Sequence, residues 1–219
     1  MGIFEEILFE FRNKYYFCGT EQIENKKQKD MKKIYSILMV AVATVSMSFS
    51  ANAEAPKWEI VAGMNVANVD ASGCSSRIGF HAGIRTTIGI PSVSNGFYGN
   101  AGALLSLKGT KAAGITFNPY YLDIPVHFGY KYAINETLAL FGEFGPYFGI
   151  GLFGKTDGYD VFSDEVGYKR FDFGLGLRAG LEFNQKVPVS IGYDFGVLDV
   201  ADDASAKTRN LTVSIGYKF

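Results

Sequence analysis

The stretch RFDFGLGLRAGLEFN, residues 170–184, alternates between two kinds of side chain. Its odd positions are apolar from Phe171 to Phe183, whereas its even positions carry glycine, charged residues and, at the end, Asn184. A period of two is typical of a β-strand with one apolar and one polar face. The stretch therefore predicts a strand, although a strand of a soluble sandwich could show the same pattern.

The same period recurs along the chain and predicts eight strands, at residues 57–67, 77–90, 97–109, 119–133, 137–153, 169–184, 187–199 and 209–219. The second, fourth and sixth connections (91–96, 134–136 and 185–186) are compact turns, and the others include longer polar loops, above all 154–168. Short turns at one end and long loops at the other are typical of bacterial outer-membrane barrels. The fold class that we predict is all-β, an eight-stranded antiparallel up-and-down transmembrane β-barrel with both ends on the periplasmic side.

A lipid face without charge can be drawn around the predicted ring. Its members are Trp58, Ile60, Met64, Ile78, Phe80, Ile84, Ile88, Leu105, Leu107, Leu122, Ile124, Val126, Phe128, Leu138, Leu140, Phe144, Phe148, Ile150, the odd positions 171–183, Val187, Val189, Ile191, Tyr193, Phe195, Leu211, Val213 and Ile215.

The opposite face, in the lumen, carries six acidic and six basic residues, among them Lys108, Lys131 and Lys218. Side chains about fill the interior of an eight-stranded barrel, and glycines between the charged positions make room for the long ones. We therefore predict ion pairs rather than an open channel, formed by Glu59, Arg85, Asp123, Glu143, Arg170, Asp172, Arg178, Glu182 and Asp194.

Aromatic residues near the strand ends favour a membrane barrel over a soluble lipocalin-like barrel, because the membrane interface selects amphipathic rings at two levels. Tyr217 and Phe219, in the last strand, are predicted to form the signal that barrel-insertion machinery reads. The expected partners are this machinery, outer-membrane lipid and an extracellular or secretion-complex protein.

Residues 31–53, MKKIYSILMVAVATVSMSFSANA, are predicted to be a secretory signal peptide, with two lysines, a short apolar run and an A-x-A cleavage site. Residues 1–30 are interpreted as a mistaken upstream extension, the alternative being a long n-region. The domain is then 54–219, in the outer membrane of a Gram-negative cell.

Composition excludes several classes of function. Residues 54–219 carry 14 Lys and Arg against 16 Asp and Glu, a balance that argues against nucleic-acid binding. Cys74 is the only cysteine after the leader, so this domain has no intrachain disulfide or cysteine-based metal site. No cofactor and no metal are expected.

Several strand segments resemble the PorT-like outer-membrane β-barrel family. They are YYLDIPVHFGYKY (120–132), GPYFGIGLFGK (145–155), RFDFGLGLRAGLEF (170–183), SIGYDFGVLDV (190–200) and SIGYKF (214–219). The resemblance implies an outer-membrane barrel, and some members of that family assist secretion across the membrane. The shared positions build the barrel, so no functional residue is carried over.

Candidate sites are few. His81 and His127, on non-adjacent strands of the lumen face, are expected to form hydrogen bonds there rather than a metal or catalytic pair. Ser106 and Ser190 also face the lumen, without a nucleophile elbow. Acidic residues at 157, 160, 164 and 165 suggest a solvated loop or a calcium site. Tyr159, Phe162 and Tyr168, in the same loop, are candidate contacts for a partner.

Three functions are consistent with these patterns. The first is a non-enzymatic outer-membrane barrel whose surface loops serve interaction or envelope structure. The alternatives are a narrow pore or component of a secretion or uptake complex, and a lipid-modifying enzyme of the outer membrane.

Overall fold

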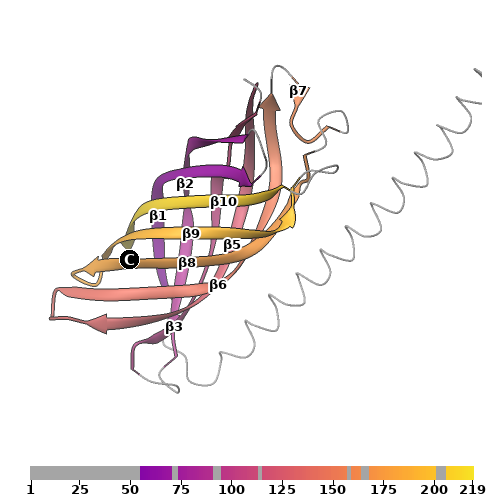
Figure 1. The fold of residues 1–219 in the computed structure, drawn as a ribbon. Coiled ribbons are helices and arrows are strands. Elements are labelled where there is room, and N and C mark those ends of the chain that lie inside the picture. The colour runs from indigo at the N-terminus through magenta and orange to yellow at the C-terminus, as the bar shows by residue number, and fades with distance from the viewer. Residues whose placement is uncertain are drawn as a thin grey trace, which may run out of the picture. The chain divides into compact units, whose positions relative to one another are not determined.

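Eight long antiparallel strands close into a barrel in the part of the chain that the structure describes (Figure 1). This computed structural model describes residues 55–70, 74–90, 95–112, 115–156, 159–163, 168–200 and 206–219, so the predicted signal peptide and the residues before it lie outside the described part. The long strands are β1 (Lys57–Asp70), β2 (Cys74–Gly89), β3 (Phe97–Leu107), β5 (Ile115–Ala133), β6 (Leu138–Thr156), β8 (Phe171–Phe183), β9 (Val187–Asp199) and β10 (Lys207–Lys218).

The ring closes where the first and last strands pair. β1 and β10 run antiparallel from Glu59↔Lys218 to Asp70↔Lys207, and every other long strand pairs with its sequence neighbours. The short strand β4 (Thr110–Ala112) pairs with β2 and β5, and β7 (Tyr159–Asp160) pairs with β6. The predicted eight-stranded up-and-down barrel is confirmed. No helix in the described ranges is long and apolar enough to cross a membrane.

The β2–β3, β5–β6 and β8–β9 connections lie at one end of the barrel, which we call the turn end; the opposite end is the loop end. Asn184 and Gln185, between β8 and β9, have φ angles of 49° and 58°, as the central pair of a type I′ hairpin turn requires. In the β5–β6 turn, the Asn135 side-chain oxygen accepts hydrogen bonds from the backbone N–H groups of Thr137 and Leu138, at 2.9 and 2.8 Å.

The predicted outer face is exposed or half-buried around the ring, with Leu107 the one buried member. Met64, Phe144 and Val213, for example, are 61%, 55% and 53% exposed. Leu107 is only 6% exposed, although its register partner on β5 is Tyr120, which puts the two side chains on the same face. Phe80 on β2 and Tyr120 on β5 lie on either side of it with ring centres 6.2 Å apart, so aromatic neighbours account for its low exposure.

Pro125 and Pro146 lie at an interruption of the β5–β6 ladder that does not change its register, whereas Pro188 stays within the β8–β9 ladder. The β5–β6 ladder pairs Pro125 with Tyr147 and resumes at Phe128↔Phe144 in the same register, so this site is a local opening rather than a bulge. The register shift between β5 and β6 falls instead between Tyr120 and Tyr121. A proline has no N–H to donate, which explains the opening.

Candidate functional site

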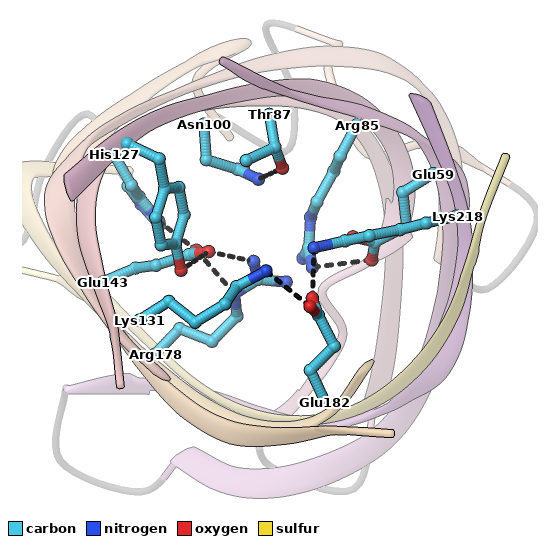
Figure 2. Close-up of polar contacts among 11 residues, drawn as sticks. Glu59, Arg85, Thr87, Asn100, His127, Lys131, Glu143, Arg178, Glu182 and Lys218 are labelled. Atoms are coloured by element: carbon cyan, nitrogen blue, oxygen red, sulfur yellow. Dashed lines mark hydrogen bonds and ion pairs between the residues drawn. The ribbon is translucent and has the colours of Figure 1, made fainter. Parts of the chain in front are cut away.

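Charged side chains point into the lumen from several strands and contact one another there (Figure 2). Glu59, Glu143, Asp172 and Glu182 are each at most 3% exposed. Charged groups are almost never buried to this extent unless they are paired. The pairs fall into three groups, centred on Glu143, Glu182 and Lys108.

Glu143 on β6 is the centre of the first group. It lies directly opposite Arg178 on β8, whose Nε and Nη2 donate to the two carboxylate oxygens at 2.7 and 2.5 Å. The Tyr98 hydroxyl on β3 donates to the same carboxylate at 2.8 Å, and His127 Nδ1 lies 3.7 Å from it. A bidentate pair with a further donor is the strong form of a charge-assisted hydrogen bond.

Glu182 on β8 forms the second group, near the turn end. Lys131 and Lys218 each bring their ammonium to within 2.5 Å of one of its two carboxylate oxygens. Arg85 and Glu59 lie nearby as a looser pair, with 3.9 Å between nitrogen and oxygen (Figure 2). The contacts of Glu182 connect β8 with β5 and β10, which are not its neighbours, whereas Glu59 and Arg85 are register partners on the adjoining strands β1 and β2.

Lys108 is the centre of the third group, toward the loop end. Its ammonium lies 2.8 Å from Asp123 and 3.6 Å from Asp172, and 4.4 Å from the centre of the Tyr147 ring. The Tyr147 hydroxyl donates to Asp172 at 3.1 Å. One buried cation is thus shared by two carboxylates and an aromatic face.

Two glycines let side chains pass over an intervening strand, as the prediction on glycine spacing anticipated. A Cβ on Gly129 would lie 2.7 Å from the Tyr98 hydroxyl, which reaches over β5 to Glu143. A Cβ on Gly63 would lie 2.7 Å from the His81 ring, which reaches over β1 to Ser214. The His81 Nε2 and Ser214 hydroxyl are 2.8 Å apart.

The structure places the remaining polar candidates in the lumen without joining them to one site. Ser106 and Ser190 are buried, and Asp194 accepts a hydrogen bond from the Asn210 amide at 3.0 Å. A serine–histidine contact exists, but it uses Ser214 rather than either predicted serine. His81 Nδ1 has no hydrogen-bond partner among the described residues. No group of three or more metal-binding side chains gathers within the described ranges.

Cavities interrupt the filled lumen in the described part of the chain. A cavity of about 40 Å³ lies among the charged groups and is lined by His81, Asp123, His127 and Arg178, among others. Its size and polar walls suit ordered water. A wider cavity of about 410 Å³ opens at the turn end and is lined by Tyr98, Lys131, Glu182 and Lys218, among others. The ion pairs of the second group thus line the wider cavity.

The structure does not bring Arg170 into this network, so its predicted lumen position is wrong. Arg170 precedes β8, and its side chain is 43% exposed. Its guanidinium donates to the carbonyls of Gly151 and Leu152 and lies 3.8 Å from Asp160 in the loop. The alternation continued one residue beyond the strand, where the pleat no longer fixes the direction of the side chain.

Only one of the three predicted aromatic loop contacts is exposed. Tyr159 is 62% exposed, whereas Phe162 is 9% exposed and packs edge-on against Tyr121. Tyr168 packs against the buried cluster of Val69, Val200 and Ala206, and burial raises its pKa. Phe162 and Tyr168 therefore stabilise the loop end rather than face a partner. Of the acidic loop residues, only Asp160 lies in the described ranges.

Tyr217 and Phe219 lie on the outer face at the turn end, 51% and 69% exposed. Trp58, Tyr130 and Tyr132 are exposed at the same end, as predicted for an interfacial ring. The role of Tyr217 and Phe219 in insertion stays a prediction.

Comparisons with solved structures find barrels of the same kind. Neisserial surface protein A is 17% identical over 76% of this chain and all of that chain, with a TM-score of 0.51. The Ail protein of Yersinia pestis, solved with the heparin analogue sucrose octasulfate, is 19% identical over 76% and 100%, with a TM-score of 0.44. The outer membrane enzyme PagL is 16% identical over 74% and 98%, with a TM-score of 0.45. At these identities the likeness concerns the fold alone.

No curated protein matches the chain. The family model for the outer membrane protein beta-barrel domain matches residues 37–219, which include every described strand. A model that covers so much of the chain shows both the family and the compartment. This chain belongs to the outer-membrane proteins with this β-barrel domain.

Proposed function

We propose that the protein is a non-enzymatic surface barrel, closed by its own side chains, which presents its loop end to a partner outside the cell. The filled lumen is the observation that carries this proposal. Glu143 and Glu182 each hold two or more partners from other strands, so the bore is crossed by side chains at more than one level (Figure 2). This arrangement supports a structural rather than a conducting interior.

Two strands are much longer than the membrane needs. β5 and β6 have 19 residues each, whereas a tilted strand crosses a bilayer with roughly 9–11. Long loops of such barrels lie outside the cell. The loop-end parts of β5 and β6, with β7, are therefore proposed to project beyond the outer surface and to carry the exposed Tyr159.

A photo-crosslinking amino acid placed at position 159 tests this proposal on intact cells. We expect a covalent adduct of defined mass from position 159, because an exposed ring on a projecting hairpin is suited to anchoring a partner. The same amino acid at Thr137, an exposed residue in the β5–β6 turn, is the matched control and should give none. Efficient surface labelling of position 159 without any adduct would refute the loop-end interaction.

The second candidate is a narrow pore or a component of a secretion complex. The cavity at the turn end favours this candidate, because a lumen that is open at one end could admit a solute or a segment of a secreted protein. The resemblance to PorT-like barrels, some of which assist secretion, points the same way. A lipid-modifying enzyme is less well supported, since the His81–Ser214 contact is buried inside the lumen and away from lipid.

A further inference from the structure

A groove of about 720 Å³ lies at the loop end of the β2, β5 and β6 wall. Its lining includes Arg77, Asn118 and Lys155, together with Tyr120 and Phe153. Asn118 pairs with Lys155, and Tyr120 with Phe153, as neighbours on β5 and β6. The groove therefore combines an aromatic row with a polar and cationic row on adjoining strands.

The two rows have a fixed order along the barrel axis. Phe80, Tyr120 and Phe153 form the aromatic row, with ring centres 6.2 and 4.8 Å apart. Aromatic rings on such a wall mark the level of the membrane interface. Asn118 and Lys155 lie two positions closer to the loop end than Tyr120 and Phe153. Arg77, which also lines the groove, lies three positions closer than Phe80 and so extends from the other face of β2. The polar row is thus placed at the level of the outer headgroups.

The groove has an excess of positive charge. Neither Arg77 nor Lys155 has an ion-pair partner among the described residues; the Arg77 guanidinium only donates to the Phe117 carbonyl, at 3.4 Å. The one carboxylate in the lining, Asp160 on β7, is the register partner of Lys155, but its ion pair is with Arg170, at 3.8 Å. Two cations against one carboxylate that is already paired leave positive charge for a further anion, and a guanidinium and an ammonium are suited to a phosphate.

We propose that this groove binds the phosphate of an outer-leaflet lipid headgroup, with Arg77 and Lys155 as its cationic contacts. The aromatic row lies against the upper part of the same lipid. The site is independent of the loop-end partner and of the closed lumen, so it stands whether or not they do.

Lipid retention measured by native mass spectrometry tests the site. The purified full-length barrel in detergent is offered diphosphoryl lipid A or the same lipid without its phosphates. We expect the wild type to retain the phosphorylated lipid, and the Arg77→Gln/Lys155→Gln variant to bind it about tenfold more weakly, since two charge-assisted contacts are lost. Lys186→Gln, which removes an exposed lysine at the turn end, is the matched control and should bind like the wild type.

Three results would overturn the proposal. Equal retention by the double variant would remove Arg77 and Lys155 from the site, and equal retention of the phosphate-free lipid would show that chains alone are bound. Displacement of the lipid by millimolar inorganic phosphate would show that free phosphate, not a headgroup, is the ligand. A gel shift between heated and unheated samples establishes that each variant is folded.

Discussion

Replacing Glu143 by alanine is expected to lower the free energy of unfolding by about 3–5 kcal/mol, because removing one partner leaves a buried charge uncompensated. Glu143 is 3% exposed and Arg178 6% exposed, so little water can replace the lost carboxylate. The Tyr98 hydroxyl loses its acceptor in the same step. Denaturant titration of the barrel in lipid vesicles measures this change.

An exposed pair provides the matched control. Arg209 and Asp70 lie 3.2 Å apart at the loop end, with side chains 29% and 66% exposed. Asp70→Ala should change the stability by less than about 1 kcal/mol, as is usual for surface pairs. If Glu143→Ala is as mild as Asp70→Ala, the lumen must be wet and the pair unimportant for stability.

Replacing Ile191 by arginine is expected to destabilise the membrane-inserted barrel by about 2–4 kcal/mol, the range for a charge on the lipid face near the bilayer midplane. Ile191 is 55% exposed and lies two residues from the middle of β9. Its register partner on β10, Val213, is also apolar and 53% exposed. The new guanidinium would therefore lie next to apolar side chains and lipid.

Val197→Arg introduces the same side chain nearer the membrane surface and so tests how the loss of stability depends on depth in the bilayer. Val197 is on the same strand and face, 48% exposed, but two residues from the loop end of β9. Near the interface the expected loss is only about 0–1 kcal/mol. Equal losses at positions 191 and 197 would show that this face does not cross the bilayer in the direction described.

The fold could be predicted because a period of two specifies both strand and face. The stretch 171–183 shows this most clearly, since its odd residues face outward and its even residues face the lumen along the whole of β8. The prediction was wrong where this strand begins. Arg170 continues the alternation in sequence, but it precedes β8, where the period no longer sets the direction of the side chain.

Which residues face the lumen was easier to predict than which of them form hydrogen bonds and ion pairs with one another. Glu143 and Arg178 are direct cross-strand neighbours, so register alone brings them together. Tyr98 and Ser214 were missed because each is reached across a strand, over Gly129 and Gly63. A glycine between two polar lumen positions was the available signal. Phe162 and Tyr168 were assigned to the surface because loop packing depends on contacts between distant segments, which alternation does not encode.

The central claim, that side chains close the lumen, is tested most directly by single-channel recording of the wild-type barrel in a planar bilayer. Steady conductance should be absent, because Tyr98 with Glu143, and Glu182 with Lys131 and Lys218, link strands that are not neighbours and so cross the bore. A barrel of eight strands leaves room for little more than its own side chains. A stable, ion-selective current through the folded wild-type protein would contradict the closed lumen and favour the pore.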